Sequence, residues 1–247
     1  MNQGREFGHV LITGASSGIG AALARHYAAP GRTLSLHGRD EVRLQAVAAA
    51  AGTAGAEVAT GTGDVRDRTA LSAWIDTRDR ARAVDLVIAN AGVSGRPADE
   101  TIAVNVMGVI NTIEPILPAM RERRRGTIAI ISSLAAWRGL PTAPAYGASK
   151  AAVRLWGEGL RPRLRPFGVR VCVVCPGFVA TPLVATNRFP MPLVMDADRA
   201  ARRIARGLDR GRARIAFPLR LYLLVRLIAA LPPAWTDPIL ARFNAKE

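Results

Sequence analysis

The sequence contains few of the residues on which disulfide-stabilised and metal-binding proteins depend. Its 247 residues include two cysteines, and aromatic residues make up 5%. Cys172 and Cys175 belong to an apolar run, 169–175, that is typical of a buried strand. Residues three apart in a strand point to opposite faces, so the two thiols are not expected to share a ligand. We therefore expect neither a disulfide framework nor a metal site, and we interpret both cysteines as core residues.

Lysine and acidic residues are also scarce. Two of the 34 basic residues are lysines, Lys150 and Lys246, and with 19 acidic residues the formal net charge is +15. A charge of this size can attract nucleic acid or an anionic membrane. The excess of arginine and alanine is, however, typical of a genome-wide composition bias, and we find no nucleic-acid-binding motif. We expect no nucleic-acid partner.

The sequence also lacks a long hydrophobic run and a recognisable leader. Its most apolar stretch, 218–231, contains two arginines and is short for a transmembrane helix. The first residues do not show the cationic, apolar and small-residue pattern of a secretory signal. We expect a cytoplasmic protein, with membrane association through the apolar stretch as an alternative.

The segment from Tyr146 to Lys150, with the sequence YGASK, is the feature around which the chain is organised. A tyrosine and a lysine four positions apart on a helix lie on the same face, one turn from each other. A free phenol has a pKa of about 10 and is a poor base near neutrality. A neighbouring cation favours the phenolate, so Lys150 is expected to lower the pKa of Tyr146. The alternative, a surface pair without a chemical role, is weakened by the other motifs.

A glycine-rich turn follows the first predicted strand, residues 10–12. The turn has the sequence TGASSGIG, from Thr13 to Gly20, and leads into a helix rich in alanine and leucine. A turn of this kind presents backbone N–H groups and the positive end of a helix to a phosphate. Its spacing is G-x3-G-x-G, whereas the dinucleotide fingerprint is G-x-G-x-x-G. The turn alone does not identify a ligand, because glycines also occur in turns for steric reasons.

Strands and helices alternate along the chain. Strands are predicted at 10–12, 33–37, 58–60, 84–89, 127–132, 169–175 and 214–217. Helices are predicted at 18–29, after Asp40 up to 51, at 67–80, at 101–124, from the Tyr146 motif to Pro162 or Pro166, and from Asp196 or Asp198. The alternation predicts an α/β fold: a single-domain, Rossmann-type doubly wound parallel sheet of about seven strands, with helices on both faces. We expect a dinucleotide-binding and catalytic domain at 1–217 and a C-terminal extension at 218–247.

Together these motifs resemble the short-chain dehydrogenase/reductase family, in its compact single-domain branch. The matches follow the family's order over roughly residues 8 to 217. They are TGASSGIG, Asp64-Val65, Asn90-Ala91-Gly92, Asn105, Ser133, YGASK and the segment from Pro176 to Thr181. The resemblance implies an oxidoreductase that transfers a hydride between a nicotinamide cofactor and a carbonyl compound or secondary alcohol.

The resemblance also implies four catalytic residues. Ser133 would hydrogen-bond the substrate oxygen, and Tyr146 would donate a proton in reduction or remove one in oxidation. Lys150 would lower the pKa of Tyr146 and hold the nicotinamide ribose. Asn105 would bend its helix and connect Lys150 to solvent through a water molecule. Ser132 is expected to face the sheet or the cofactor.

The residue after the second strand bears on the choice of cofactor. An acid there would bind the ribose hydroxyls of NAD, whereas an arginine would accept the 2′-phosphate of NADP. The chain has Gly38 and Arg39, so NADP(H) is expected, with NAD(H) as the alternative, while Asp40 is expected to cap the next helix. The implied cofactor-binding residues are Gly14, Ser16, Ser17, Gly18, Ile19, Gly20, Arg39, Asp64, Val65, Asn90, Ala91, Gly92, Tyr146, Lys150, Pro176, Gly177, Val179 and Thr181.

Two apolar segments bear on substrate and partners. Residues 182–184 and 189–195 correspond to the substrate lid of relatives, which favours a lipophilic carbonyl or alcohol substrate, with simple core cover as the alternative. The stretch 218–231 follows an arginine-rich helix, so peripheral contact with an anionic membrane is one hypothesis. Packing on a partner subunit of a homodimer or homotetramer, or over the substrate site, are the others.

A non-catalytic cofactor-binding or membrane-docking protein on the same fold is the competing functional hypothesis. The complete set of Ser133, Tyr146 and Lys150 argues against it. A binding protein has no need of an acid and a base aligned with each other.

Overall fold

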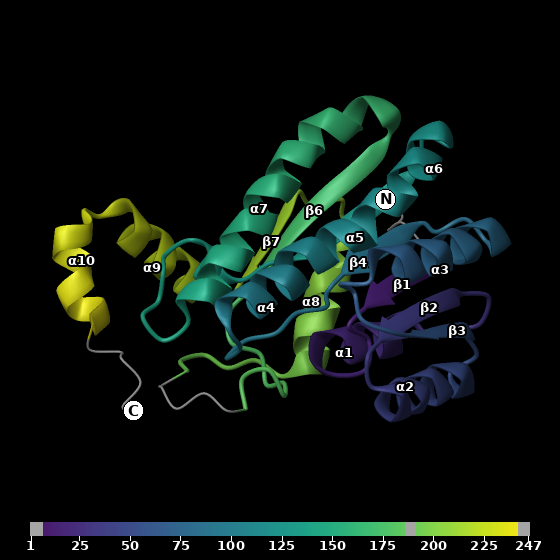
Figure 1. Ribbon diagram of the computed structural model, residues 1–247, viewed down its shortest axis with the longest axis horizontal. Coiled ribbons are helices and arrows are strands. Elements are labelled where there is room, and N and C mark those ends of the chain that lie inside the picture. The colour runs from purple at the N-terminus through teal and green to yellow at the C-terminus, as the bar shows by residue number, and fades with distance from the viewer. Residues whose placement is uncertain (1–6, 186–190, 242–247) are drawn as a thin grey trace.

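The computed structural model describes residues 7–185 and 191–241. These residues form a seven-stranded sheet in which every neighbouring pair is parallel, in the order β3-β2-β1-β4-β5-β6-β7 (Figure 1). The predicted doubly wound parallel sheet is therefore confirmed. The strands are β1 (His9–Thr13), β2 (Thr33–Gly38), β3 (Glu57–Thr62), β4 (Leu86–Ala89), β5 (Gly126–Ile131), β6 (Val169–Pro176) and β7 (Arg214–Phe217).

Helices cover both faces of this sheet, as Figure 1 shows. One face is covered by α1 (Gly18–Tyr27), α2 (Glu41–Thr53) and α8 (Ala197–Asp209). The other is covered by α3 (Arg68–Ala81), α4 (Ala98–Ile102), α5 (Gly108–Ile113), α6 (Leu117–Glu122) and α7 (Pro144–Leu164). The helix of the Tyr146 motif thus passes through Pro162 and ends before Pro166.

The two layers of the core follow from the alternation of side chains along each strand. In β1, Val10 and Ile12 pack with α1, α2 and α8, whereas Leu11 packs in the cluster on the opposite face. Removing a large apolar side chain from water contributes about 1.5–3 kcal/mol, so both layers stabilise the sheet. Cys172 and Cys175 are buried free thiols that belong to different apolar clusters, which confirms their interpretation as core residues.

The helix predicted at 101–124 is present as a helical run, and the irregularity expected at Asn105 lies within it. The run starts at Ala98, contains a π-helical turn at Ala103–Met107 and a 3₁₀ turn at Glu114–Ile116, and ends at Glu122. The π turn contains Asn105, whose side chain bonds the backbone of Val93 instead of facing solvent. The 3₁₀ turn contains Pro115, which lacks the N–H group that an α-helix requires.

The same run, Ala98–Glu122, is long and apolar enough to cross a membrane by length and composition alone. Its side chains Val109, Ile113 and Met120 are, however, fully buried against the sheet in the cluster that also holds α3 and α7. An apolar stripe of this kind is what a core helix of an α/β fold requires. We therefore assign the run to the core.

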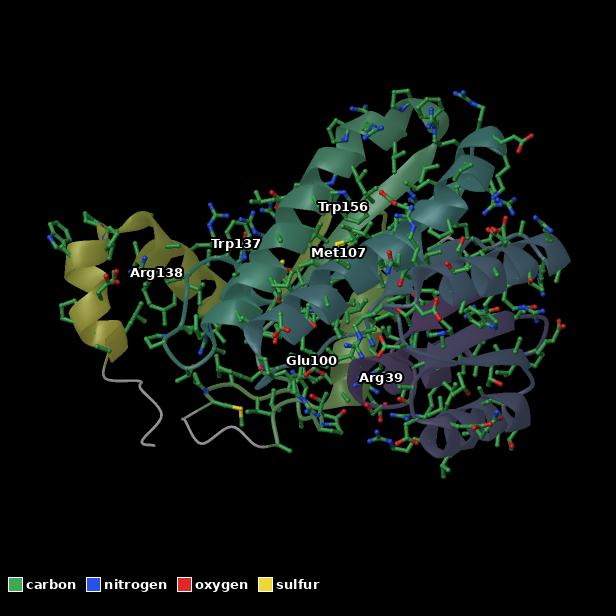
Figure 2. All side chains as sticks on the ribbon, viewed as in Figure 1. Arg39, Glu100, Met107, Trp137, Arg138 and Trp156 are labelled. Carbon is green, nitrogen blue, oxygen red and sulfur yellow. The ribbon has the colours of Figure 1, made fainter. Side chains whose placement is uncertain are left out.

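The C-terminal helices α9 (Leu219–Ala230) and α10 (Pro233–Leu240) project from the end of the sheet that carries β7 (Figure 1). The Arg226 guanidinium lies 4.3 Å from the centre of the Trp137 ring. Arg138 donates to the Thr236 hydroxyl at 2.7 Å and also bonds Asp237. Figure 2 shows Trp137 and Arg138 on the side of the molecule that faces these helices. A few polar contacts thus connect the extension to the loop that precedes α7.

No residue of α9 is fully buried among the described residues, although Leu221 and Tyr222 pack against the apolar cluster of Leu134, Val173 and Cys175. Four leucines of α9 are 51–59% exposed: Leu219, Leu223, Leu224 and Leu227. The contact of this segment with a partner subunit or an anionic membrane stays a prediction. The same holds for the division of the chain at residue 217 and for the homodimer or homotetramer.

Candidate active site

A cleft of about 530 Å³ opens at the carboxyl ends of the strands, where an open α/β sheet is expected to bind ligands. Its walls come from the glycine-rich turn after β1 and from the ends of β2, β3, β4, β5 and β6. The first two turns of α7 close it with Tyr146 and Lys150. Residues more than a hundred positions apart in the sequence thus meet at one edge of the sheet.

The glycine-rich turn is packed so closely that side chains would not fit. Gly14 has a φ of +67°, and a Cβ there would lie 2.8 Å from the Cα of Ala91. A Cβ on Gly20 would lie 2.2 Å from the Gly14 carbonyl oxygen. Ser17 precedes the first residue of α1, but its side chain does not cap the helix. The first N–H groups of α1 therefore point toward the cleft without a side-chain acceptor, an arrangement that suits a phosphate.

Asn90 fixes this turn to the end of β4. Its side-chain amide donates to the carbonyl oxygens of Thr13 at 3.1 Å and Gly14 at 3.0 Å. Its backbone N–H donates to the Thr13 hydroxyl at 3.3 Å. Asn90 lines the cleft, but in this structure its amide is used to hold the turn. Its predicted place beside a cofactor stays a prediction.

Ser133 and Tyr146 meet on the wall of the cleft. Ser133 follows β5, and its hydroxyl accepts a hydrogen bond from the Ala135 N–H at 3.1 Å. Tyr146 lines the same wall of the cleft. Burial raises the pKa of Tyr146 above its usual value, and the nearby Ser133 side chain acts in the opposite direction. The phenol is therefore protonated at neutral pH, which is the state that a proton donor requires.

Lys150 is buried one helical turn beyond Tyr146. Its ammonium donates to the Ile131 carbonyl oxygen at 3.0 Å and lies 5.7 Å from the centre of the Tyr146 ring. Burial lowers the pKa of Lys150 to about 8. The sequence predicted that Lys150 lowers the pKa of Tyr146; this effect stays a prediction, and the net shift of the Tyr146 pKa is upward. Burial dominates at both residues, since the low-dielectric surroundings disfavour the phenolate and the ammonium alike.

Asn105 lies behind the cleft rather than in its wall. Its side chain accepts from the Val93 N–H at 2.7 Å and donates to the Val93 carbonyl at 2.9 Å and the Ser149 hydroxyl at 2.9 Å. A Cβ on Gly92 would lie 3.2 Å from the Asn105 carbonyl oxygen and 3.3 Å from the Lys150 ammonium. Asn105 therefore holds the strand end beside Lys150. Its role in a proton relay stays a prediction.

Arg39, which follows β2, also lines the cleft. Its side chain is 53% exposed and its guanidinium approaches the Asp64 carboxylate to 3.9 Å. Asp64 bonds Arg66 much more closely, at 2.8 Å, and this bond lowers the pKa of the Asp64 carboxyl. Arg39 is thus held only weakly and can turn toward a ligand. Asp40 caps α2 by accepting from the Arg43 N–H at 2.9 Å, as predicted.

The segment after β6 forms the remaining wall, next to Tyr146. Pro176, Gly177, Val179 and Thr181 all line the cleft, and the Gly177 N–H is fixed by the Phe217 carbonyl at 2.7 Å. Two further backbone bonds join the segments at 178–180 and 195. Residues 182–184 of the expected lid also line the cleft. Of its second part, Phe189 and Pro190 lie outside the described residues.

Sequence reasoning missed several residues of the cleft, of which His37 is the most informative. It is the last residue before Gly38 in β2 and is buried, with its ring 5.2 Å from that of Trp74. Its Nδ1 has no hydrogen-bond partner within the described structure, and burial lowers the pKa of the imidazole. From the sequence alone, a histidine at the end of a strand cannot be assigned either to the core or to a binding site. Arg43 and Val93 also line the cleft, and no sequence motif marks them as binding residues.

The structure brings nearly all of the predicted site residues to one cleft. The exceptions are Gly20, which packs against Gly14, and Asn105. The cleft also fits a dinucleotide chemically: close-packed glycines and a free helix start lie at its centre, and hydroxyl, phenol and ammonium groups lie at one end. Its volume of about 530 Å³ falls in the range of ligand-binding clefts.

Comparison with known proteins identifies the class. Residues 8–190 match the family described as short chain dehydrogenase. An oxidoreductase of Myxococcus xanthus, whose specific activity is not characterised, is 41% identical over 244 residues, covering 95% of this chain and 96% of that protein. The chain therefore belongs to the short chain dehydrogenase family and is an oxidoreductase.

Solved structures agree with this assignment. A short-chain dehydrogenase from Sphingobium yanoikuyae in complex with NADPH is 28% identical, with a TM-score of 0.77 and coverage of 95% of this chain and 93% of that chain. A 3-oxoacyl-[acyl-carrier protein] reductase from Brucella melitensis with bound NAD is 26% identical, with a TM-score of 0.75 and coverage of 87% and 91%. These two relatives hold different nicotinamide cofactors, so likeness alone does not decide the cofactor of this chain.

Proposed function

We propose that the protein reduces a carbonyl compound to an alcohol, with NADPH as the preferred hydride donor. The observation that carries this proposal is the protonated Tyr146 phenol, which lines the same cleft as Ser133 and as Lys150 one helical turn away. An acid, a hydrogen-bond donor and a cation that converge on one position are what a developing alkoxide requires. Reduction of an oxoacyl group by a relative of similar structure supports the choice of substrate class.

Ser133, Tyr146 and Lys150 have different roles in the proposed reduction. Ser133 and Tyr146 hold the carbonyl oxygen between two hydroxyl groups, which fixes the carbonyl carbon in the cleft. A nicotinamide bound beside them would supply the hydride. As negative charge develops on the substrate oxygen, Tyr146 gives it the phenolic proton, so that the product is a neutral alcohol. Lys150 stabilises the phenolate left behind, because its charge lies within one helical turn.

A substrate panel tests the reaction directly. We expect oxidation of NADPH, followed by the loss of its absorbance, in the presence of at least one of a set of long-chain, cyclic and steroid-like ketones. The apolar residues Leu183 and Val184 in the wall of the cleft favour such lipophilic substrates over sugars. A protein that binds NADPH but consumes it with none of these ketones or their alcohols would support the competing binding-protein hypothesis.

The preference for NADPH rests on charge at the end of β2. Gly38 carries no acid, and a Cβ there would lie 3.3 Å from the Ser16 side chain. Arg39 and Arg43 line this end of the cleft, and Arg39 is only weakly paired with Asp64. A 2′-phosphate placed here would gain a charge-assisted hydrogen bond from Arg39.

Replacing Arg39 with alanine is expected to weaken NADPH binding by about one to two decades, since a hydrogen bond to a charged group contributes roughly 1.5–3 kcal/mol. NADH binding should change little because NADH lacks the 2′-phosphate. Fluorescence titration of both cofactors measures the difference. Arg68→Ala is the control, since Arg68 pairs with Glu114 outside the cleft. Equal losses for NADPH and NADH in Arg39→Ala would indicate that Arg39 has a structural role instead.

A further inference from the structure

A second, smaller pocket lies at the opposite end of the sheet from the cleft. It has a volume of about 200 Å³ and is formed at the amino ends of β5 and β6 by the end of α7, the end of α8 and the loop before β7. β7 begins at Arg214, which pairs with Val173, so the first residues of β6 have no β7 neighbour within the described sheet. The loop at 211–213 covers this open edge incompletely, and the pocket is the space that remains.

Arginines dominate the wall of this pocket. Arg161, Arg165, Arg170 and Arg212 line it, and no carboxylate is among the residues that do so. Within the part of the chain that the structure describes, Arg161, Arg165 and Arg212 form no ion pair. Guanidinium groups gathered in this way repel one another, and a bound anion would offset that repulsion.

Two observations show that the pocket is more than a patch of exposed charge. Arg161 is fixed across its wall, because its side chain donates to the carbonyl oxygens of Val171 at 3.3 Å and Ala213 at 2.9 Å. Thr127 also lines the pocket and is 3% exposed, and its hydroxyl has no hydrogen-bond partner in the described structure. It neighbours Arg170 in the strand register. A buried hydroxyl without a partner costs free energy, so a ligand that reaches it gains a contact.

We propose that this pocket binds a phosphate group. Guanidinium groups match phosphate oxygens with paired, charge-assisted hydrogen bonds, and a threonine hydroxyl can donate a further one. The volume of about 200 Å³ suits one or two phosphate groups, whereas the cleft of about 530 Å³ suits a dinucleotide. The source is either inorganic phosphate or a small phosphorylated metabolite. The site is independent of the proposed oxidoreductase activity.

Two double variants test the proposal with the folded, full-length chain. Arg165→Gln with Arg212→Gln removes two exposed arginines of the pocket, and Arg163→Gln with Arg210→Gln removes two exposed arginines beside them that do not line it. Both variants lose the same charge and leave the cleft unchanged, so phosphate bound in the cleft contributes equally to both. Calorimetric titration with inorganic phosphate, and separately with glycerol phosphate, is performed at about 0.15 M ionic strength, where diffuse attraction is screened.

We expect saturable binding that the pocket variant loses by about ten- to a hundredfold and that the control variant keeps within about twofold. Thr127→Val, which removes a hydroxyl without a partner and should fold normally, is expected to weaken binding by about two- to tenfold. Tighter binding of glycerol phosphate would identify a phosphorylated metabolite as the source, and equal or tighter binding of inorganic phosphate the free ion. Equal losses in the two double variants, or no saturable binding, would overturn the proposal.

Discussion

Replacing Tyr146 with phenylalanine is expected to lower carbonyl reduction by roughly 10²–10⁴-fold, the contribution of a positioned general acid. The change removes one hydroxyl group, which lies in the cleft with Ser133 and is protonated because burial raises the pKa of the phenol. The ring and the rest of the cleft are unchanged, so NADPH affinity should stay within about twofold of that of the unaltered protein. The loss of a hydrogen bond to a charged group would weaken NADPH binding much more than this.

Steady-state turnover and cofactor fluorescence measure these two effects separately. Tyr222→Phe is a matched control, because its hydroxyl contacts Arg214 and Arg226 and lies outside the cleft. Near-normal turnover in Tyr146→Phe would contradict the assignment of the proton donor. A large loss of NADPH affinity would instead show that the phenol mainly binds the cofactor.

Replacing Lys150 with methionine is expected to reduce both turnover and NADPH affinity, in contrast to Tyr146→Phe. It also has an effect on stability with a definite pH dependence. Burial lowers the pKa of Lys150 from 10.5 to about 8 in the folded protein. Below pH 8 the folded protein therefore carries a buried charge at a cost, and between pH 8 and 10.5 it releases a proton that the unfolded chain keeps. The contribution of Lys150 to stability thus rises with pH over this interval.

The methionine variant lacks this titration, and its stability relative to the unaltered protein should fall by about 3 kcal/mol between pH 7 and 10.5. Denaturant unfolding of both proteins at several pH values measures this change, and other titrating groups cancel in the difference. The variant also loses the hydrogen bond from Lys150 to the Ile131 carbonyl. Below about pH 8, where Lys150 is charged, this loss changes the difference in stability by a constant amount. A difference independent of pH would mean that Lys150 is not desolvated.

The fold could be predicted well because its determinants are local. The alternating apolar runs and the turns between them gave all seven strands, and the same alternation explains why Val10 and Leu11 belong to different layers of the core. The helical run at 101–124 and its irregularity at Asn105 were expected, but the contact made by Asn105 was not. The Asn105 side chain bonds Val93, and no pattern within the helix itself reveals this pairing.

The site was predictable where a residue type is tied to a motif, and less so where burial decides its properties. Ser133, Tyr146 and Lys150 lie together as their spacing suggested. The net direction of the Tyr146 pKa shift could not be read from the sequence, because the spacing shows that a cation is near but not how far both groups are removed from water. His37 was missed for the same reason, since only the fold shows that its ring borders the cleft.

The transfer of an isotopic label tests the central claim most directly. The protein is incubated with a reducible ketone and NADPH that carries deuterium at either face of the nicotinamide C4 position, and the alcohol product is analysed by mass spectrometry. The proposed function predicts one deuterium on the former carbonyl carbon from one of the two labelled cofactors, and no label above background in Tyr146→Phe over the same time. An unlabelled alcohol, or equal labelling by the Tyr146→Phe variant, would contradict hydride transfer with Tyr146 as the acid.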